Sequence, residues 1–426
     1  MAKLEQILRN QMAELVDTDY TQFIVRPEEK SLDLDSHLAQ VVVGVRRCGK
    51  STLCQKVLMQ SNVKFAYINF DDETLANLKA DQLNELIESL YRIHGPFTHL
   101  FMDEIQNAPS WPLFVNRLLR SGLKLILTGS NANLLSGDLI THLAGRYNEI
   151  RLYPFSFAEY CRIRQVDTTS QTTKAIGLRG HAFNEYLMTG GFPEVVGSAN
   201  TRPYVSALLK TIINKDICKR YKVRYQNTLQ QLANETLDNF CQELDYASIS
   251  KDLGIKSVHT TKNYIGYFDN AYLIRLLHKY SYKSRERQST LKCYAIDPAF
   301  ITSHDNALQS DNLGWRLENV VAIELLRRLE NALQDVYYIR EAQGYEVDFA
   351  VTDGNRVKQL IQVTYDFLDP TKKLYNREIG GLLKASMHTH CDNLTLIVMF
   401  GDTRDIEDSG KTIHVVNAAD WLLGKI

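Results

Sequence analysis

The sequence feature that most restricts the fold is a short segment with two glycines, residues 44–51, which reads GVRRCGKS. An apolar run, Val41–Val43, comes directly before it, and residues 52–59 after it have the pattern of a helix. Glycine permits a tight turn in which successive backbone N–H groups face one anion, and the positive end of the next helix points at the same place. A chance glycine turn is the alternative, but the strand and the helix on either side favour a phosphate-binding P-loop.

The residue types within this segment also fit the chemistry of a nucleoside triphosphate. Lys50 can reach the β- and γ-phosphates, and the Ser51 hydroxyl can bind Mg²⁺. We therefore predict ATP and Mg²⁺ as the cofactors. The residues expected to contact them are Gly44, Arg46, Arg47, Cys48, Gly49, Lys50, Ser51 and Thr52.

A second motif supplies the acidic groups that hydrolysis of ATP requires. The apolar residues Leu100–Met102 are followed by Asp103 and Glu104. Mg²⁺ prefers oxygen ligands, so Asp103 is predicted to hold the metal ion. Glu104 is the candidate base that orients the attacking water. Many strands end in acidic turns, and this pair gains its meaning from the P-loop that precedes it.

Two further polar groups follow along the chain. Leu125–Asn131 reads LILTGSN, an apolar strand that ends in small polar residues. In ATPases of the AAA+ kind, which this arrangement resembles, a polar side chain here senses the γ-phosphate, so Asn131 or Ser130 is a candidate; a plain turn is the alternative. Arg146 could neutralise charge in the transition state, in its own subunit or in a neighbour's, or it could form a structural ion pair.

Short apolar strands alternate with helices in the first part of the chain, which predicts a parallel sheet with helices on both faces. The expected strands are Val41–Val45, Phe65–Phe70, Leu100–Ile105 and Leu123–Thr128, and the expected helices are Gln82–Ile93 and Pro112–Leu119. The fold class is therefore α/β, a P-loop NTPase sheet, and the resemblance of its motifs to those of AAA+ ATPases implies the AAA+ type. We expect four parts: an N-terminal helix and approach segment (1–35), the ATPase domain (36–164), a helical and winged-helix region (181–290), and a mixed α/β nuclease-like domain (291–426).

Taken together, the motifs resemble a large prokaryotic family of AAA+ superfamily ATPases. The resemblance is carried by VVVGVRRCGKSTL, FMDEIQ, LTGSNANLL, LAGRY and LYPFSFAEY, and it continues through TGGFPEVV at Thr189–Val196. It implies an ATPase domain followed by a domain of unknown function with a winged-helix segment and a nuclease-like end. The resemblance covers nearly the whole chain.

The middle of the chain contains a helix, a turn at Gly254, a second helix and a strand, within residues 246–274. This order is typical of a winged helix-turn-helix. The second helix has a polar side that could meet DNA phosphates and base edges. Its polar residues are Lys256, His259, Thr260, Lys262 and Asn263. Winged helices also serve as packing modules, so binding of double-stranded DNA is one of two open interpretations.

The C-terminal part resembles the PD-(D/E)XK nuclease fold. Glu318 on a long helix, Asp348 on a strand and Gln362 on the next strand occupy the positions of the metal-binding residues of that fold. Thr364 stands where the fold has a lysine, so the usual chemistry lacks its positive charge. The lysines nearby that could take its place are Lys358 and Lys372. We therefore favour a degenerate nuclease fold that is kept for binding or assembly.

Composition limits the partners only weakly. The formal net charge is -1 and the pI is about 6.8, so no overall basic field attracts nucleic acid or a membrane. The 7 cysteines are scattered without a CxxC pair, which argues against a zinc or disulfide framework and favours the cytoplasm. The first residues lack the apolar core of a signal peptide, and no apolar run approaches the length of a membrane span.

The leading hypothesis is a Mg²⁺-dependent AAA+-type ATPase that acts as a nucleotide-driven switch. One alternative is a DNA-binding regulator that binds ATP with negligible turnover, and another is an ATP-gated nuclease, against which the missing lysine counts. AAA+ proteins often assemble so that one subunit completes the site of the next. Besides ATP and double-stranded DNA, the expected partners are therefore further copies of the chain and an unidentified protein, with no membrane partner.

Overall fold

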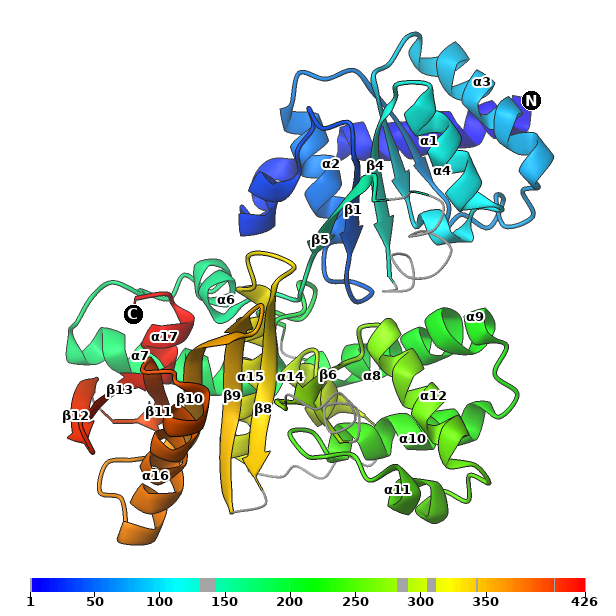
Figure 1. Cartoon of the computed structure of the whole chain (residues 1–426). Coiled ribbons are helices and arrows are strands. Elements are labelled where there is room, and N and C mark those ends of the chain that lie inside the picture. The colour runs from blue at the N-terminus through cyan, green and yellow to red at the C-terminus, as the bar shows by residue number, and fades with distance from the viewer. Residues whose placement is uncertain are drawn as a thin grey trace. The chain divides into compact units, whose positions relative to one another are not determined.

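The computed structural model describes residues 2–130, 143, 145–198, 200–281, 290–304, 312–341, 344–401 and 403–425. The chain forms two compact units. The first consists of Met1–Tyr153 with Asn270–Tyr272, and the second of Pro154–Asp269 with Leu273–Ile426. Figure 1 shows both units, with many of their elements labelled and the colour running from blue at the N-terminus to red at the C-terminus.

A five-stranded parallel sheet forms the centre of the first unit, in the order β2-β3-β4-β1-β5 (Figure 1). Its strands are β1 (Ala39–Val43), β2 (Phe65–Asn69), β3 (His99–Asp103), β4 (Lys124–Gly129) and β5 (Tyr147–Arg151). Every residue of β1 and β3 is buried, as expected for strands covered on both faces. The predicted parallel α/β sheet is therefore confirmed.

The strand order decides which face of the sheet each helix covers. The helices of this unit are α1 (Ala2–Asp17), α2 (Lys50–Gln60), α3 (Leu83–His94) and α4 (Trp111–Arg120), with 3₁₀ turns η1 (Tyr20–Gln22), η2 (Pro27–Ser31), η3 (Ala80–Gln82) and η4 (Ile105–Asn107). The chain moves toward the β2 edge through α2 and returns toward β5 through α3 and α4. Because parallel crossovers are right-handed, α2 lies on one face and α3 and α4 lie on the other.

Two strands end two residues earlier than the sequence suggested. β1 stops at Val43 because the backbone turns at Gly44, where φ is 155°. β3 stops at Asp103 because Glu104 adopts the left-handed conformation with φ of 50°. In both strands the extended backbone ends where the polar motif begins, so the motif residues lie on turns at the carboxyl end of the sheet.

Helices make up the first part of the second unit. They are α6 (Phe157–Ile163), α7 (Thr173–Thr189), α8 (Thr201–Thr211), a π-helix η6 (Ile212–Cys218), α9 (Lys219–Tyr221), α10 (Gln226–Asp238), α11 (Tyr246–Asp252) and α12 (Val258–Asn270). Between α11 and α12 the chain turns at Gly254, which has a φ of 64°. The helix, turn, helix and strand expected here are present in that order.

An eight-stranded mixed sheet forms the rest of the second unit, in the order β12-β13-β11-β10-β9-β8-β6-β7. Its strands are β6 (Ile274–Lys279), β7 (Leu291–Ala295), β8 (Gln334–Glu341), β9 (Tyr345–Asp353), β10 (Arg356–Asp366), β11 (Leu394–Phe400), β12 (Arg404–Asp408) and β13 (Lys411–Asn417). β6 pairs with both β7 and β8. The boundary expected at residue 291 therefore falls inside one continuous sheet.

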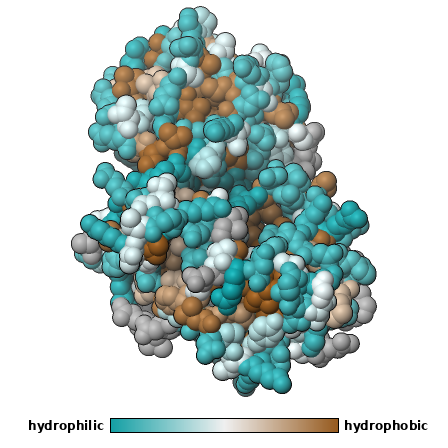
Figure 2. All heavy atoms as spheres, turned by 90° about the vertical axis from the view of Figure 1, so that its left-hand side faces the viewer, coloured by the Kyte–Doolittle hydropathy of each residue, from teal (hydrophilic) through white to brown (hydrophobic). Residues whose placement is uncertain are grey.

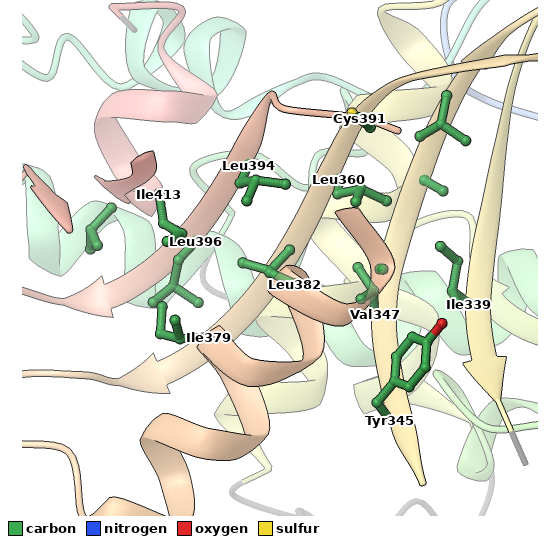
Figure 3. Packing of buried hydrophobic residues seen from close by; sticks show 14 of the residues in the cluster. Ile339, Tyr345, Val347, Leu360, Ile379, Leu382, Cys391, Leu394, Leu396 and Ile413 are labelled. Atoms are coloured by element: carbon green, nitrogen blue, oxygen red, sulfur yellow. The ribbon is translucent and has the colours of Figure 1, made fainter. Parts of the chain in front are cut away.

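Apolar side chains fix the helices on this sheet. The helices are α14 (Pro298–Ser303), α15 (Leu313–Arg327), α16 (Lys372–Thr389) and α17 (Ala418–Leu422). In Figure 3, Ile379 and Leu382 of α16 point toward the strands, where Leu360 of β10 and Leu394 and Leu396 of β11 lie. All five are fully buried. This cluster is the core on the α16 side of the sheet.

On the face shown in Figure 2 hydrophilic residues predominate, and hydrophobic ones occur in small groups. β12, at one edge of the eight-stranded sheet, carries four charged side chains, namely Arg404, Asp405, Glu407 and Asp408. Within the described parts of the chain, no helix is both long enough and apolar enough to cross a membrane.

Candidate functional site

The turn after β1 is shaped by the strand beside it. Gly44 has no room for a side chain, because a Cβ there would overlap the carbonyl oxygen of Leu152, just after β5. The same oxygen accepts a hydrogen bond from Cys48 Sγ at 3.3 Å. Burial raises the pKa of the Cys48 thiol, so the thiol keeps the proton that it donates. The back of the loop is thus packed against Leu152.

Lys50 places a positive charge inside this loop. Gly49 has a φ of 98° and caps the N-terminus of α2, and Lys50 is the first residue of that helix. The Lys50 Nζ donates to the carbonyl oxygens of Gly44 and Val45, each at 3.1 Å. A buried ammonium needs such partners. Carbonyl oxygens of the loop therefore hold the Lys50 ammonium, which is the positive charge that would bind a phosphate.

Ser51 and Asp103 come from separate elements and meet beside the loop. The Ser51 hydroxyl donates to Asp103 Oδ1 at 2.9 Å. The Asp103 carboxyl is only 3% exposed. Burial and, to a lesser extent, the neighbouring carboxylate of Glu104 raise its pKa to about 6, although the hydrogen bonds from Thr128 and Ser51 oppose the shift. A buried carboxylate next to a hydroxyl is the set of hard oxygen ligands that Mg²⁺ prefers, so these residues fit the metal.

Thr128 on β4 connects the two acidic residues, and the sequence motifs did not single it out. Its Oγ1 donates to Asp103 Oδ1 and accepts the backbone N–H of Glu104 at 3.0 Å. The carboxylate of Glu104 in turn accepts hydrogen bonds from Gln106 Nε2 and, at 3.4 Å, from Ser130 Oγ. Glu104 is thus held by both its backbone and its side chain, in a left-handed conformation that non-glycine residues seldom adopt.

The remaining residues expected around the nucleotide divide into three groups. Arg46, in the loop, pairs with Asp71 after β2 at 3.3 Å. Arg47 has a φ of 69° at the tip of the loop, and Thr52 follows in the first turn of α2. Asn131 lies outside the residues that the structure describes.

Arg146 lies at the opposite end of the sheet from the loop. Its backbone carbonyl accepts from the N–H of Ala39, the first residue of β1, whereas the loop follows the last residue of that strand. The length of β1 separates the two, which is about 13 Å for four residue steps. The guanidinium also donates to Asn116 Oδ1 on α4 at 2.9 Å. Within its own subunit Arg146 therefore lies at the far end of the sheet from the loop.

Comparison with known proteins agrees with this geometry. Residues 36–161 match the family model described as "AAA domain", and residues 180–311 match a domain of unknown function, DUF8612. An uncharacterized protein of Methanocaldococcus jannaschii, MJ1544, is 34% identical over 90% of this chain and 88% of its own length. The chain belongs to the same family as MJ1544, and its residues 36–161 match the AAA domain. A second relative, an uncharacterized protein of Haemophilus influenzae, is 30% identical over 91% of this chain and 95% of its own.

Solved structures give more distant likenesses to this AAA-domain protein. The Walker-type ATPase paby2304 of Pyrococcus abyssi is 15% identical, covers 65% of this chain and 95% of its own, and has a TM-score of 0.39. Domain III of the replication initiation protein DnaA of Thermotoga maritima is also 15% identical, covers 46% of this chain and 88% of its own, and has a TM-score of 0.28. Such low scores say nothing about the chemistry of this chain.

A second cluster of polar residues lies in the second unit of the AAA-domain protein. Asp348 accepts the backbone N–H of Val363 at 2.9 Å, and its own N–H donates to Gln362 Oε1 at 3.2 Å. Glu318 on α15 accepts the hydroxyl of Tyr294 at 2.9 Å. The three residues that the sequence selected, Glu318, Asp348 and Gln362, are thus brought to one part of the fold.

Lys292 on β7 lies at the centre of this cluster. Its Nζ is 3.2 Å from Glu318, 2.8 Å from Glu346 and 4.0 Å from Asp348. Lys292 is 4% exposed. Burial alone would lower its pKa, but the carboxylates outweigh that effect and raise the pKa above its ordinary value. The two lysines considered from the sequence, at positions 358 and 372, are both exposed.

The carboxylates of this cluster are correspondingly difficult to ionise. Burial raises the pKa of Asp348 well above its ordinary value, and the nearby Glu318 adds to this shift. Burial also raises the pKa of Glu318, and there the added repulsion comes from Glu346. Lys292 opposes both shifts. Throughout the described residues, no group of three or more His, Cys, Asp or Glu side chains is arranged to hold a metal ion. As the cluster stands, its cation is Lys292.

Proposed function

We propose that this AAA-domain protein is a Mg²⁺-dependent ATPase that works as a nucleotide-driven switch. The observation that carries the proposal is the contact between Ser51 on α2 and Asp103 at the end of β3, at 2.9 Å, with Glu104 directly after it. This contact joins the phosphate-binding loop, a metal-binding carboxylate and a candidate base. A protein that only bound ATP would not need a base held as firmly as Glu104 is.

Each residue of the site then has a chemical task. Mg²⁺, when bound by Ser51 and Asp103, would neutralise charge on the phosphates. Lys50 would exchange the carbonyl oxygens of its own loop for β- and γ-phosphate oxygens. Glu104 would orient the attacking water. The further contacts that we propose for the nucleotide are Gly44, Arg46, Arg47, Cys48, Gly49 and Thr52, with Asn131 near the γ-phosphate.

The test is steady-state ATP hydrolysis by the wild type, Lys50→Ala and Glu104→Gln, each with and without Mg²⁺. We expect Lys50→Ala to lose binding and Glu104→Gln to keep binding but lose turnover, by about 10²–10⁴-fold as is typical for a general base. Glu88→Gln, an exposed residue of α3, is the matched control. Turnover that survives Glu104→Gln would refute the assignment of the base, and ATP binding without any wild-type turnover would favour the binding-only regulator.

Contact with DNA is a second part of the proposal, and α11 and α12 support it. Their helix-turn-helix order is followed by the antiparallel pair β6 and β7. Lys256, His259, Lys262 and Asn263 are all exposed at or on α12, where they would meet a phosphate backbone. We expect Lys262→Ala to weaken binding of double-stranded DNA and to reduce its salt dependence. Equal binding by this variant would count against α12 as the contact.

Assembly into a homo-oligomer is a third part, and Arg146 motivates it. This arginine is exposed and lies at the far end of the sheet from its own loop, so a role in catalysis requires the site of a neighbouring subunit. We expect gel filtration with ATP and Mg²⁺ to show an oligomer and Arg146→Ala to lower turnover without weakening ATP binding. A monomer under these conditions would remove the role in catalysis. We also propose a cytoplasmic location, which the buried free thiols support.

The cluster around Lys292 favours one other candidate function, cleavage of a phosphodiester. Two observations support it. The elements follow in the order α15, β8, β9, β10, α16 and β11, and Lys292, close to Asp348, would supply the positive charge that Thr364 cannot. The test is cleavage of supercoiled plasmid with Mg²⁺ or Mn²⁺ by the wild type and Asp348→Asn, with Lys358→Met as the control. Cleavage that only Asp348→Asn abolishes would support a nuclease. No cleavage by the wild type, with or without ATP, would leave a degenerate fold.

A further inference from the structure

Arg26 lies behind the nucleotide-binding loop, outside every motif that the sequence indicated. It is only 5% exposed although its side chain is always charged. Its guanidinium donates from Nη1 to the carbonyl oxygen of Cys48 at 3.2 Å and from Nη2 to that of Tyr153 at 3.0 Å. One planar group therefore joins the loop to the residue that follows β5 and Leu152.

The segment that carries Arg26 is itself anchored to the helix after the loop. The backbone N–H of Arg26 donates to Glu29 Oε1 at 2.8 Å, at the start of η2. The same oxygen of Glu29 pairs with Lys56 of α2 at 2.9 Å. Glu28 lies 3.7 Å from Arg26 Nε and balances its charge. Arg26 thus has a fixed position relative to α2, whose first residue is Lys50.

The geometry of the peptide bond links Arg26 to phosphate binding. A trans peptide is planar, so its carbonyl and its N–H point in opposite directions. The carbonyl of Cys48 and the N–H of Gly49 belong to one peptide. When Arg26 holds that carbonyl at the back of the loop, the N–H of Gly49 is directed to the other side, where the loop and the N-terminus of α2 face an anion.

We propose that Arg26 is a positioning residue of the nucleotide site: by holding the Cys48 carbonyl, it aims the Gly49 N–H at the phosphate chain. The inference rests on the proposed function, since it assumes that ATP binds at this loop. Arg26 itself does not touch the nucleotide. Its planar fork is what matters, because a lysine keeps the charge but cannot hold two carbonyl oxygens in fixed directions.

The test is calorimetric titration of the full chain with ATP, ADP and AMP, using the wild type, Arg26→Met, Arg26→Lys and the exposed control Arg9→Met. The loss of a hydrogen bond to a charged group predicts affinities for ATP and ADP about 10- to 100-fold lower in Arg26→Met. Arg26→Lys should recover only part of this loss. Affinity for AMP should change little, since the loop binds the β-phosphate. A purely structural role would not distinguish AMP from ADP.

Each outcome is decisive. If Arg26→Lys folds and binds ADP as the wild type does, the inference is overturned, and this holds even if Arg26→Met fails to fold. An equal loss for AMP and ADP would also overturn it, because the defect would then not concern the phosphate chain. If the wild type binds no ATP at all, the proposed function fails before Arg26 is tested. Tighter binding of ADP to the wild type and Arg9→Met than to both Arg26 variants is the supporting result.

Discussion

Replacing Lys292 with methionine tests how the second unit tolerates buried charge. Methionine has a similar length and no charge, so the change removes the cation and leaves Glu318, Glu346 and Asp348 without it. The side chains of Glu318 and Asp348 are only 12% and 10% exposed, so little water is present to screen their repulsion. The variant should therefore be less stable because its buried carboxylates lack a cation, and not because packing is lost.

The structure allows the size and the sign of the effect to be worked out. Removing one partner of a buried ion pair costs about 3–5 kcal/mol, mostly because the other charges remain unpaired. The pKa values of Asp348 and Glu318 are already raised by burial, and they rise further without Lys292. A carboxyl whose pKa is raised by folding loses stability as the pH rises through that pKa. The deficit should be about 3–5 kcal/mol at pH 8 and clearly smaller at pH 5.

Urea unfolding followed by tryptophan emission can measure this deficit in the second unit alone. Of the three tryptophans, Trp111 belongs to the first unit, and Trp315 and Trp421 belong to the second. In a Trp111→Phe background, the remaining emission reports only on the second unit. Lys358→Met, an exposed change on β10, is the matched control and should stay within about 0.5 kcal/mol of its background.

Two results would refute the reasoning. A loss below about 1 kcal/mol at pH 8 would mean that water or a neighbouring group already screens the carboxylates. A large loss that is equal at pH 5 and pH 8 would point to packing instead of charge. The double variant Lys292→Met with Asp348→Asn should recover part of the stability, because it removes one of the unpaired charges.

Three further predictions follow from other parts of the structure. Thr128→Val keeps the shape of the side chain but leaves the buried N–H of Glu104 without its acceptor, so the first unit should lose about 1–3 kcal/mol in urea unfolding, and Thr128→Ser should not. Burial raises the pKa of Asp297 to about 7, so the unfolding free energy should fall by about 2 kcal/mol from pH 5.5 to pH 8, and much less in Asp297→Asn. All seven cysteines are buried as free thiols, so a thiol reagent should label the native protein slowly and the urea-unfolded chain fully; rapid native labelling would contradict the packing of Cys48.

The parts of the site that the sequence predicted are those encoded by local order. The glycines, Lys50 and Ser51 follow one strand, and Asp103 and Glu104 end another, so each motif sits on a turn whose place in a parallel sheet is set by the fold class. Thr128 could not be predicted in the same way. Its role depends on β4 lying beside β3 in the sheet, which the spacing along the chain does not reveal.

The sequence was least informative about charged residues that are far apart in the chain but close together in the structure. Lys292 reaches Glu318, Glu346 and Asp348 from a strand that lies before all three, and no motif marks it. Arg146 illustrates the opposite problem. It follows the third motif closely in the chain, but β5 runs parallel to β1, so the residue before β5 lies at the far end of the sheet from the loop. Proximity in sequence did not become proximity in space.

The charged edge strand β12 has a consequence for how copies of this chain can associate. Edge strands expose unpaired backbone groups that can pair with the edge of another molecule, and charged side chains along the edge oppose this. On β12, Arg404, Asp405, Glu407 and Asp408 place such charges along a strand of only five residues. Two copies would bring these carboxylates together if their β12 strands paired. The eight-stranded sheet is thereby protected from growing into a continuous sheet across molecules, and the protein should stay dispersed at concentrations where an apolar edge would promote aggregation.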